Sequence, residues 1–187
     1  APWSRPTALA LASVDQRKDV YMTDASKGIV LRLQMLPADM KKVLEPPRVL
    51  ATTNEVAKPY GIAVHEGVIF VSDESEHRVV AFLEDLRYSF EWGSFGSEVG
   101  EFNTPQGMCI MRSAIYIADS LNHRVQCFTT TQGTFVRTFG AFGDDAGDFQ
   151  AAVNDSRMHD QEDQSRENSS DSSDDILVIG ESFRSTA

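Results

Sequence analysis

Two short segments of this sequence, 46 residues apart, carry the side chains best suited to chemistry. Asp73–Arg78 and Asp119–Arg124 both begin with Asp and end with His-Arg at the same spacing. An Asp, a His and an Arg close together could transfer a proton, bind an anion or help to hold a metal ion. A metal ion would need three or four converging ligands, and neither segment has a further His or Cys at ligand spacing. The sequence therefore predicts no metal site.

Exact repetition favours a structural role for most of these side chains, because a residue that every repeat contains serves the repeat. Each Asp ends an apolar run, where a carboxylate can accept hydrogen bonds from turn amides or from the nearby Arg. The predicted structural motif comprises Asp24, Asp73, Arg78, Asp119 and Arg124. The residues predicted to be available for binding on the same face are Tyr60, His77, Arg78, Asn122 and His123.

The elements that would position these residues also repeat. Pro59-Tyr60-Gly61 returns as Pro105-Gln106-Gly107, again after 46 residues. Each repeat contains four short apolar runs separated by turn residues, which is the pattern of strands. Four antiparallel strands in a repeat of this length are typical of a β-propeller blade. We therefore expect an all-β chain built as a β-propeller.

The repeat divides the single domain, 1–187, into about three and a half blades. A weaker copy precedes the two clear ones, and a partial copy follows them, interrupted by a polar insertion. The predicted bounds are 6–52, 59–93 and 105–140 for the complete blades, 142–153 and 176–187 for the fourth, and 154–175 for the insertion.

The second clear copy resembles the NHL repeat. It contains Asp119-Ser120-Leu121-Asn122-His123-Arg124, preceded by the Pro-Gln-Gly strand and a Gly-Glu-Phe linker. NHL domains are usually closed six-bladed propellers, so the resemblance implies an incomplete propeller here. It also implies a non-catalytic platform that binds proteins and, in some members, RNA, as in tripartite-motif-type proteins.

Three functions follow from this resemblance and from the residues. The first is a protein-interaction scaffold without a cofactor or small-molecule substrate. The second is RNA binding, which is disfavoured because acidic residues such as Glu74 and Glu76 lie beside His77-Arg78. The third is a fragment of a propeller enzyme of the amidating-lyase or lactonase type. The first strands argue against it, because they offer Ile62, Met108 and similar side chains rather than paired carboxylates or histidines.

The composition indicates whether the chain can form a core, whether it can span a membrane, and in which redox compartment it is expected. With 187 residues, 41% of them hydrophobic, it can form a core, and no apolar run approaches the roughly 20 residues that span a membrane. Cys109 and Cys127 are expected on the first and third strands of one blade, too far apart for a disulfide. Two core thiols favour a reducing compartment, and the chain, which opens on Ala1 rather than Met, is expected to be a cytoplasmic fragment.

The charge and the insertions point to one face of the disc. Eleven acidic residues but only Arg157 and Arg166 as cations lie within 144–175, so most of the net charge of −11 is there. Residues 154–175 are expected to be disordered, with Ser172 as a candidate phosphorylation site. Strand parity assigns this insertion, the expanded loop 35–47 and four extra residues near Val14–Asp19 to the bottom face. The top face, which carries His77 and His123, is expected to be smooth.

Overall fold

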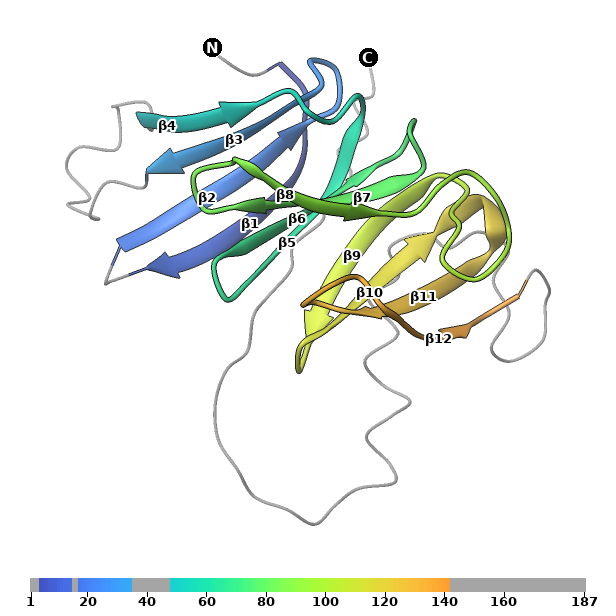
Figure 1. The fold of residues 1–187 in the computed structure, drawn as a ribbon. Helices are drawn as coiled ribbons and strands as arrows, with labels where there is room; N and C mark the ends of the chain where they lie inside the picture. Colours follow the sequence, from blue (N-terminus) through green and yellow to red (C-terminus); the bar gives the residue numbers. More distant parts are fainter. Residues whose placement is uncertain (1–3, 15–16, 35–47, 142–187) are drawn as a thin grey trace.

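The computed structural model describes residues 4–14, 17–34 and 48–141, which form three four-stranded antiparallel sheets (Figure 1). In each sheet the strands are neighbours in chain order. The first sheet contains β1 (Pro6–Val14), β2 (Arg17–Asp24), β3 (Ile29–Gln34) and β4 (Arg48–Thr53). The second contains β5 (Pro59–His65), β6 (Val68–Asp73), β7 (Arg78–Leu83) and β8 (Tyr88–Trp92). The third contains β9 (Pro105–Met111), β10 (Ala114–Asp119), β11 (Arg124–Thr129) and β12 (Phe135–Phe139).

These sheets fall in the three repeats expected from the sequence, except that β4 ends at Thr53, one residue beyond the expected 6–52. A single three-residue 3₁₀ helix, η2 (Ser120–Asn122), is the only helical element among the described residues, and it takes the place of the turn expected between β10 and β11. The partial fourth repeat, 142–153 and 176–187, and the insertion 154–175 with Ser172 lie outside the described residues, as does the loop 35–47.

Successive sheets pack face to face, and the middle sheet is buried on both sides. Neighbouring residues of a strand point to opposite faces, so Ile69 packs toward the first sheet and Phe70 toward the third. The interface of the first two sheets includes Tyr21, Val30, Ile69, Val71 and Phe82. The interface of the second and third includes Phe70, Phe102, Ile115, Ile117 and Phe128. All of these side chains are completely buried.

The first strands of the second and third sheets approach each other closely, which explains the glycine two residues after Pro59. A Cβ atom on Gly61 would lie 2.2 Å from the main-chain oxygen of Gln106 in the next sheet. The hydroxyl of Ser72 bridges the two strands, because it accepts from the amide of Gly61 at 2.8 Å and donates to the Gln106 carbonyl at 2.7 Å. Thr23 makes the equivalent bond one sheet earlier, donating to the Tyr60 carbonyl at 2.8 Å.

The four extra residues of the first repeat lengthen a hairpin instead of expanding a loop. β1 continues to Val14 and β2 begins at Arg17, and the ladder extends to the pair Val14↔Arg17. The expectation of an enlarged loop near Val14–Asp19 was wrong, since added residues in both strands pair with each other and extend the ladder.

The two cysteines differ in exposure. Cys127 is buried, as expected, but Cys109 is exposed. The expectation of two core thiols was wrong for Cys109, because its side of β9 faces away from the second sheet. Both residues are opposite Tyr116 in the ladder, so one strand separates them and both thiols are free.

Within the described residues, no helix has the length and apolar character that crossing a membrane requires.

Candidate interaction surface

The top face is formed by turns and linkers that contact one another. His77, in the turn between β6 and β7, accepts a hydrogen bond at Nδ1 from the Thr104 amide at 3.0 Å. Its ring centroid lies 4.9 Å from that of Phe95. Both partners belong to residues 93–104, the linker between β8 and β9, which we call the 93–104 linker. The turn and the linker therefore share one face.

The histidines occupy a special backbone position. Gly28, His77 and His123 have φ angles of 60°, 55° and 52°, and each directly precedes the third strand of its sheet. This left-handed conformation is uncommon for residues other than Gly, Asn, Asp and His. The recurrence of His at this position is thus explained by the turn it has to form.

Each repeated Asp joins the end of the second strand to the segment that precedes the first strand. Asp24 accepts from the amides of Ser4 and Arg5, at 2.5 and 2.9 Å. Asp73 accepts from those of Ala57 and Lys58, at 2.8 and 3.0 Å. Asp119 accepts from that of Asn103 at 2.6 Å. All three Asp residues are completely buried, and these are the contacts that the predicted structural role requires.

The hydrogen bonds to Asp24 change its acidity. Burial tends to raise the pKa of this carboxyl, but hydrogen bonds from Ser26, Ser4, Arg5 and Lys27 outweigh it and lower the pKa to about 2. Asp24 is therefore ionised at neutral pH and acts as an acceptor, not as a proton donor.

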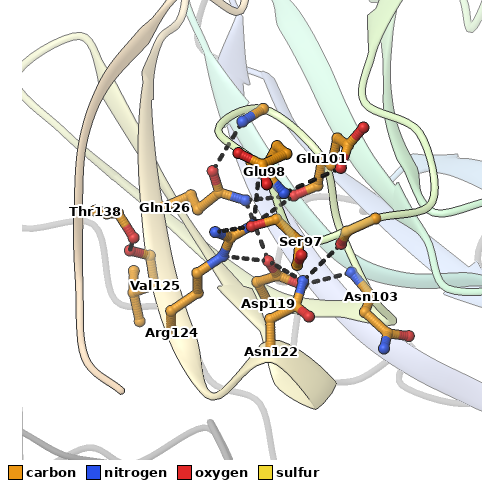
Figure 2. A network of polar contacts seen from close by, with 12 residues as sticks. Ser97, Glu98, Glu101, Asn103, Asp119, Asn122, Arg124, Val125, Gln126 and Thr138 are labelled. Carbon is orange, nitrogen blue, oxygen red and sulfur yellow. Dashed lines mark hydrogen bonds and ion pairs between the residues drawn. The ribbon is translucent and has the colours of Figure 1, made fainter. Parts of the chain in front are cut away.

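Arg124 connects the third Asp to the linker (Figure 2). Its Nε donates to Asp119 Oδ2 at 2.7 Å, and its Nη atoms donate to the main-chain oxygens of Ser97, Glu98 and Glu101 at 2.6, 2.9 and 2.8 Å. A planar guanidinium with five donors suits this fan of acceptors, and a lysine could not reproduce it.

Two further side chains hold the 93–104 linker in place. Gln126, completely buried, donates to the Glu101 carbonyl at 2.6 Å and accepts from the Gly100 amide at 3.1 Å. Asn122 donates to the Gly96 carbonyl at 2.8 Å. With Arg124, these contacts fix the linker at five of its residues, so it is a well-ordered loop of the third blade.

The linker and η2 present three large apolar side chains to solvent. Phe95, Val99 and Leu121 are 68%, 58% and 59% exposed. We call these three residues the apolar trio. Aromatic and large aliphatic side chains on a rigid support are the usual anchors of protein interfaces. The expectation of a smooth top face was wrong, because this linker of twelve residues lies on it.

The predicted binding residues are gathered on the top face, but most are used internally. Tyr60 is half-buried at the start of β5, and His123 forms the left-handed end of η2. Arg78 donates to the Glu55 carbonyl at 3.0 Å and pairs with Glu91, while its distance from Asp73 is 3.8 Å. His77 supports Phe95. No pattern in the sequence pointed to the apolar trio.

The charges of the top face leave it mildly acidic. Three of its cations are engaged: Lys58 with Glu74 at 2.9 Å, Arg78 with Glu91, and Arg124 with Asp119. The carboxylates of Glu55, Glu76 and Glu98 are exposed and form no ion pair with described residues. A surface of this kind does not attract a phosphate backbone.

The opposite end of the blades contains a shallow hollow of about 440 Å³ between the first two sheets. It is lined by Arg32, Glu66, Gly67, Leu83, Glu84, Asp85 and Arg87. Arg32 is held by Asp19, at 2.9 Å from Nε, and by the Glu84 carbonyl at 2.9 Å. Burial raises the pKa of the neighbouring Tyr21 to about 12, so its hydroxyl stays protonated at neutral pH and donates to the Glu84 carbonyl at 2.9 Å. Among the described residues, no three His, Cys, Asp or Glu side chains are placed to hold a metal ion.

Comparison with known proteins agrees with this architecture. Residues 102–128 match the sequence profile of the NHL repeat, which confirms the resemblance within the third blade. No curated protein matches the sequence significantly.

Several solved structures are similar in fold. The computationally designed Ika8 protein has a TM-score of 0.52 at 12% identity over 78% of this chain and 38% of its own. The nidogen/laminin complex has a TM-score of 0.51 at 14% identity over 73% and 47%. Sqt1 of Saccharomyces cerevisiae has a TM-score of 0.50 at 8% identity over 74% and 35%. The chain spans less than half the length of each, and the expected incomplete β-propeller is confirmed.

Proposed function

We propose that this incomplete β-propeller, with its NHL repeat, is a non-catalytic protein-interaction module that binds its partner through the apolar trio. The observation that carries the proposal is the 93–104 linker, held by Arg124, Gln126 and Asn122. It exposes Phe95 and Val99, and η2, whose Leu121 amide donates to Asn103 of the linker, exposes Leu121. The polar groups of the 93–104 linker form hydrogen bonds within the chain, whereas the side chains of the apolar trio remain exposed and available to a partner.

Rigid presentation favours binding. Ordering a loop on association costs free energy, and a loop that is already fixed avoids this cost. The solved nidogen/laminin complex, which is similar in fold, joins two proteins, and this supports a protein rather than a small molecule as partner here. RNA is less favoured, because Lys58, Arg78 and Arg124 are already paired with carboxylates.

The test compares two triple variants of the immobilised chain. Phe95→Ser, Val99→Ser and Leu121→Ser remove the apolar trio. The control variant carries Leu50→Ser, Tyr88→Ser and Val136→Ser, which replace side chains 40%, 51% and 51% exposed on other surfaces. Proteins from a cell extract that the wild type retains are quantified by mass spectrometry, and the best candidate is purified.

With the purified candidate, titration calorimetry should show a loss of at least roughly tenfold in affinity for the trio variant and none for the control. Equal affinity of the two variants would contradict the proposal. Retention of single-stranded RNA by the wild type at physiological salt, insensitive to the trio variant, would favour the RNA alternative.

A further inference from the structure

His77 contacts both ends of the 93–104 linker, whereas side chains of the third blade hold its middle. The latter reach main-chain groups between residues 96 and 101 (Figure 2). At one end of the linker, the His77 ring lies 4.9 Å from that of Phe95, at an interplanar angle of 55°. At the other end, His77 Nδ1 accepts the hydrogen bond from the Thr104 amide at 3.0 Å. One imidazole therefore supports both ends.

The contact with Thr104 requires this imidazole to be neutral. A main-chain amide can only donate, so Nδ1 of His77 has to present its lone pair and the ring proton has to be on Nε2. A second proton would bind at Nδ1 and turn the acceptor into a donor that faces another donor. Histidine is the side chain that ordinarily gains such a proton between about pH 8 and pH 5. His77 is half-buried, so the proton can reach it from solvent.

Thr104 has a backbone conformation that needs support. Its φ angle of 62° is left-handed, which is a true outlier for a β-branched residue. The Thr104 carbonyl accepts from the Ser120 amide at 3.3 Å, and the Asn103 carbonyl accepts from the Leu121 amide at 3.0 Å. Loss of the bond to His77 allows Thr104 to relax, and the relaxation reaches η2, which carries Leu121.

We infer that protonation of His77 releases both ends of the linker and weakens binding through the apolar trio, so that the surface binds more tightly at neutral pH than in mildly acidic solution. Two donors that face each other separate by movement of the ring or of the Thr104 peptide. Movement of the ring withdraws the support of Phe95, and movement of the peptide withdraws that of Leu121. The binding part of the inference rests on the proposed function, whereas the change in the linker does not.

The charged groups around His77 pair mainly with one another. The turn of His77, the linkers on either side of its sheet, β8 and the third blade contribute Asp73, Glu74, Glu76 and Arg78, Glu55 and Lys58, Glu98 and Glu101, Glu91, and Asp119, His123 and Arg124. Their ion pairs are Lys58 with Glu74, Arg78 with Glu91 and Asp73, and Arg124 with Asp119. Among the described residues, none forms an ion pair with His77. Its proton is therefore exchanged with solvent and not shared with a fixed carboxylate.

Nuclear magnetic resonance of the full 187-residue chain between about pH 7.5 and pH 5 tests the change in the linker. The Cε1–H resonance of the His77 ring reports its protonation. The exchange rate of the Thr104 amide, relative to that of an unstructured peptide at the same pH, reports the hydrogen bond. As the ring gains its proton, the protection of this amide should fall roughly five- to tenfold, which corresponds to one net hydrogen bond. The resonances of Phe95 and Leu121 should shift with the same midpoint.

Two substitutions of His77 fix the contact in opposite states without straining the turn. Asn is accepted at left-handed φ angles, and its Oδ1 offers an acceptor in place of Nδ1 but gains no proton in this pH range. Thr104 should therefore stay protected throughout in His77→Asn. Gly also tolerates the φ angle of 55° but offers no acceptor, so Thr104 should be poorly protected at every pH in His77→Gly. His65→Gln, at the other end of the second sheet, is the control and should keep the wild-type transition.

The binding part is tested by titration calorimetry with the purified partner from the trio comparison. From about pH 7.5 to pH 5.5, the affinity of the wild type should fall roughly three- to tenfold more than that of His77→Asn, a difference that cancels titration of the partner itself. Equal losses in the two chains would overturn the binding part. Failure of the proposed function shows separately, as equal affinity of the trio variant and its control variant at neutral pH.

The change in the linker has its own contrary outcomes. A His77 ring that stays neutral down to pH 5 would overturn the inference, as would a Thr104 amide that keeps its protection after the ring has gained its proton. A transition that persists unchanged in His77→Asn would assign the effect to another group and would overturn it as well.

Discussion

Arg124 and Asp119 are 2.7 Å apart, and the pair joins a buried carboxylate to a surface loop. Asp119 is completely buried, whereas the Arg124 side chain is 13% exposed and reaches three carbonyls of the 93–104 linker. In the preceding blade Arg78 is 3.8 Å from Asp73, pairs with Glu91, and donates to a single carbonyl, that of Glu55, in the shorter linker 54–58. The Asp–Arg pair of the repeat therefore makes different contacts in the second and third blades.

Asp119→Ala should lower the free energy of unfolding by about 1–3 kcal/mol, because it leaves the Asn103 amide, Arg124 and Gln126 without their acceptor. Urea denaturation with circular dichroism detection measures the change. An unchanged midpoint combined with loss of partner binding would instead assign Asp119 and Arg124 to the binding surface.

Ser72→Ala should destabilise the chain by about 1–2 kcal/mol, because the Gly61 amide and the Gln106 carbonyl lose their shared partner between blades. Ser72→Thr, which keeps the hydroxyl and resembles Thr23, is the matched control. Equal denaturation midpoints for the Ala and Thr variants would show that the bridge adds nothing measurable.

Asp24 should make the stability of the folded chain depend on pH. The pKa of its carboxyl is lowered to about 2 from an ordinary value of 3.8, so its contribution is complete above about pH 4 and lost as the pH falls toward 2. The difference in melting temperature between the wild type and Asp24→Asn should therefore shrink over this interval. A difference that stays constant from pH 5 to pH 2 would contradict the assignment.

Gly93→Ala should destabilise the chain by about 2 kcal/mol and loosen the linker. The φ angle of Gly93 is 101°, and a Cβ atom there would lie 2.5 Å from the Phe102 ring. Gly100→Ala is a useful comparison, since its φ of 84° is also unfavourable but no atom lies within 4 Å of the added Cβ. The free energy of unfolding should decrease from the wild type to Gly100→Ala and further to Gly93→Ala. Amide hydrogen exchange of residues 93–104 should increase most in Gly93→Ala.

We expect no lyase or lactonase turnover from this chain with added divalent metal. The motivating observation is that His77 supports Phe95 and Thr104 and that the first strands present apolar side chains. Product formation that disappears in His77→Ala or His123→Ala would overturn this expectation.

The sequence predicted the strands well because the repeat supplied independent copies of each signal. Pro59 and Pro105, Asp73 and Asp119, and the buried runs around Phe70 and Ile115 all indicate the same element boundaries. Agreement between the copies of the repeat is what allowed the strand boundaries to be predicted.

The exposed features were harder to predict, because they depend on which neighbour is present. Cys109 occupies the position of Ala63 in the repeat, yet it is exposed because no described sheet follows it. The exposure of Phe95 and Val99 depends on hydrogen bonds from Arg124 and Gln126 that hold the linker, and such pairings are not visible in a linear pattern. Ser172 stays a prediction, as it lies outside the described residues.

The Asp contacts also bear on how such a chain could grow. Each Asp bonds to amides only 15–20 residues earlier, in the segment that leads directly into its own repeat, so each blade together with this segment can close its own top turn. Duplication of one 46-residue segment would therefore deliver a finished unit that needs no compensating change elsewhere. Local closure also means that a blade can form while it leaves the ribosome, before the next one has been translated.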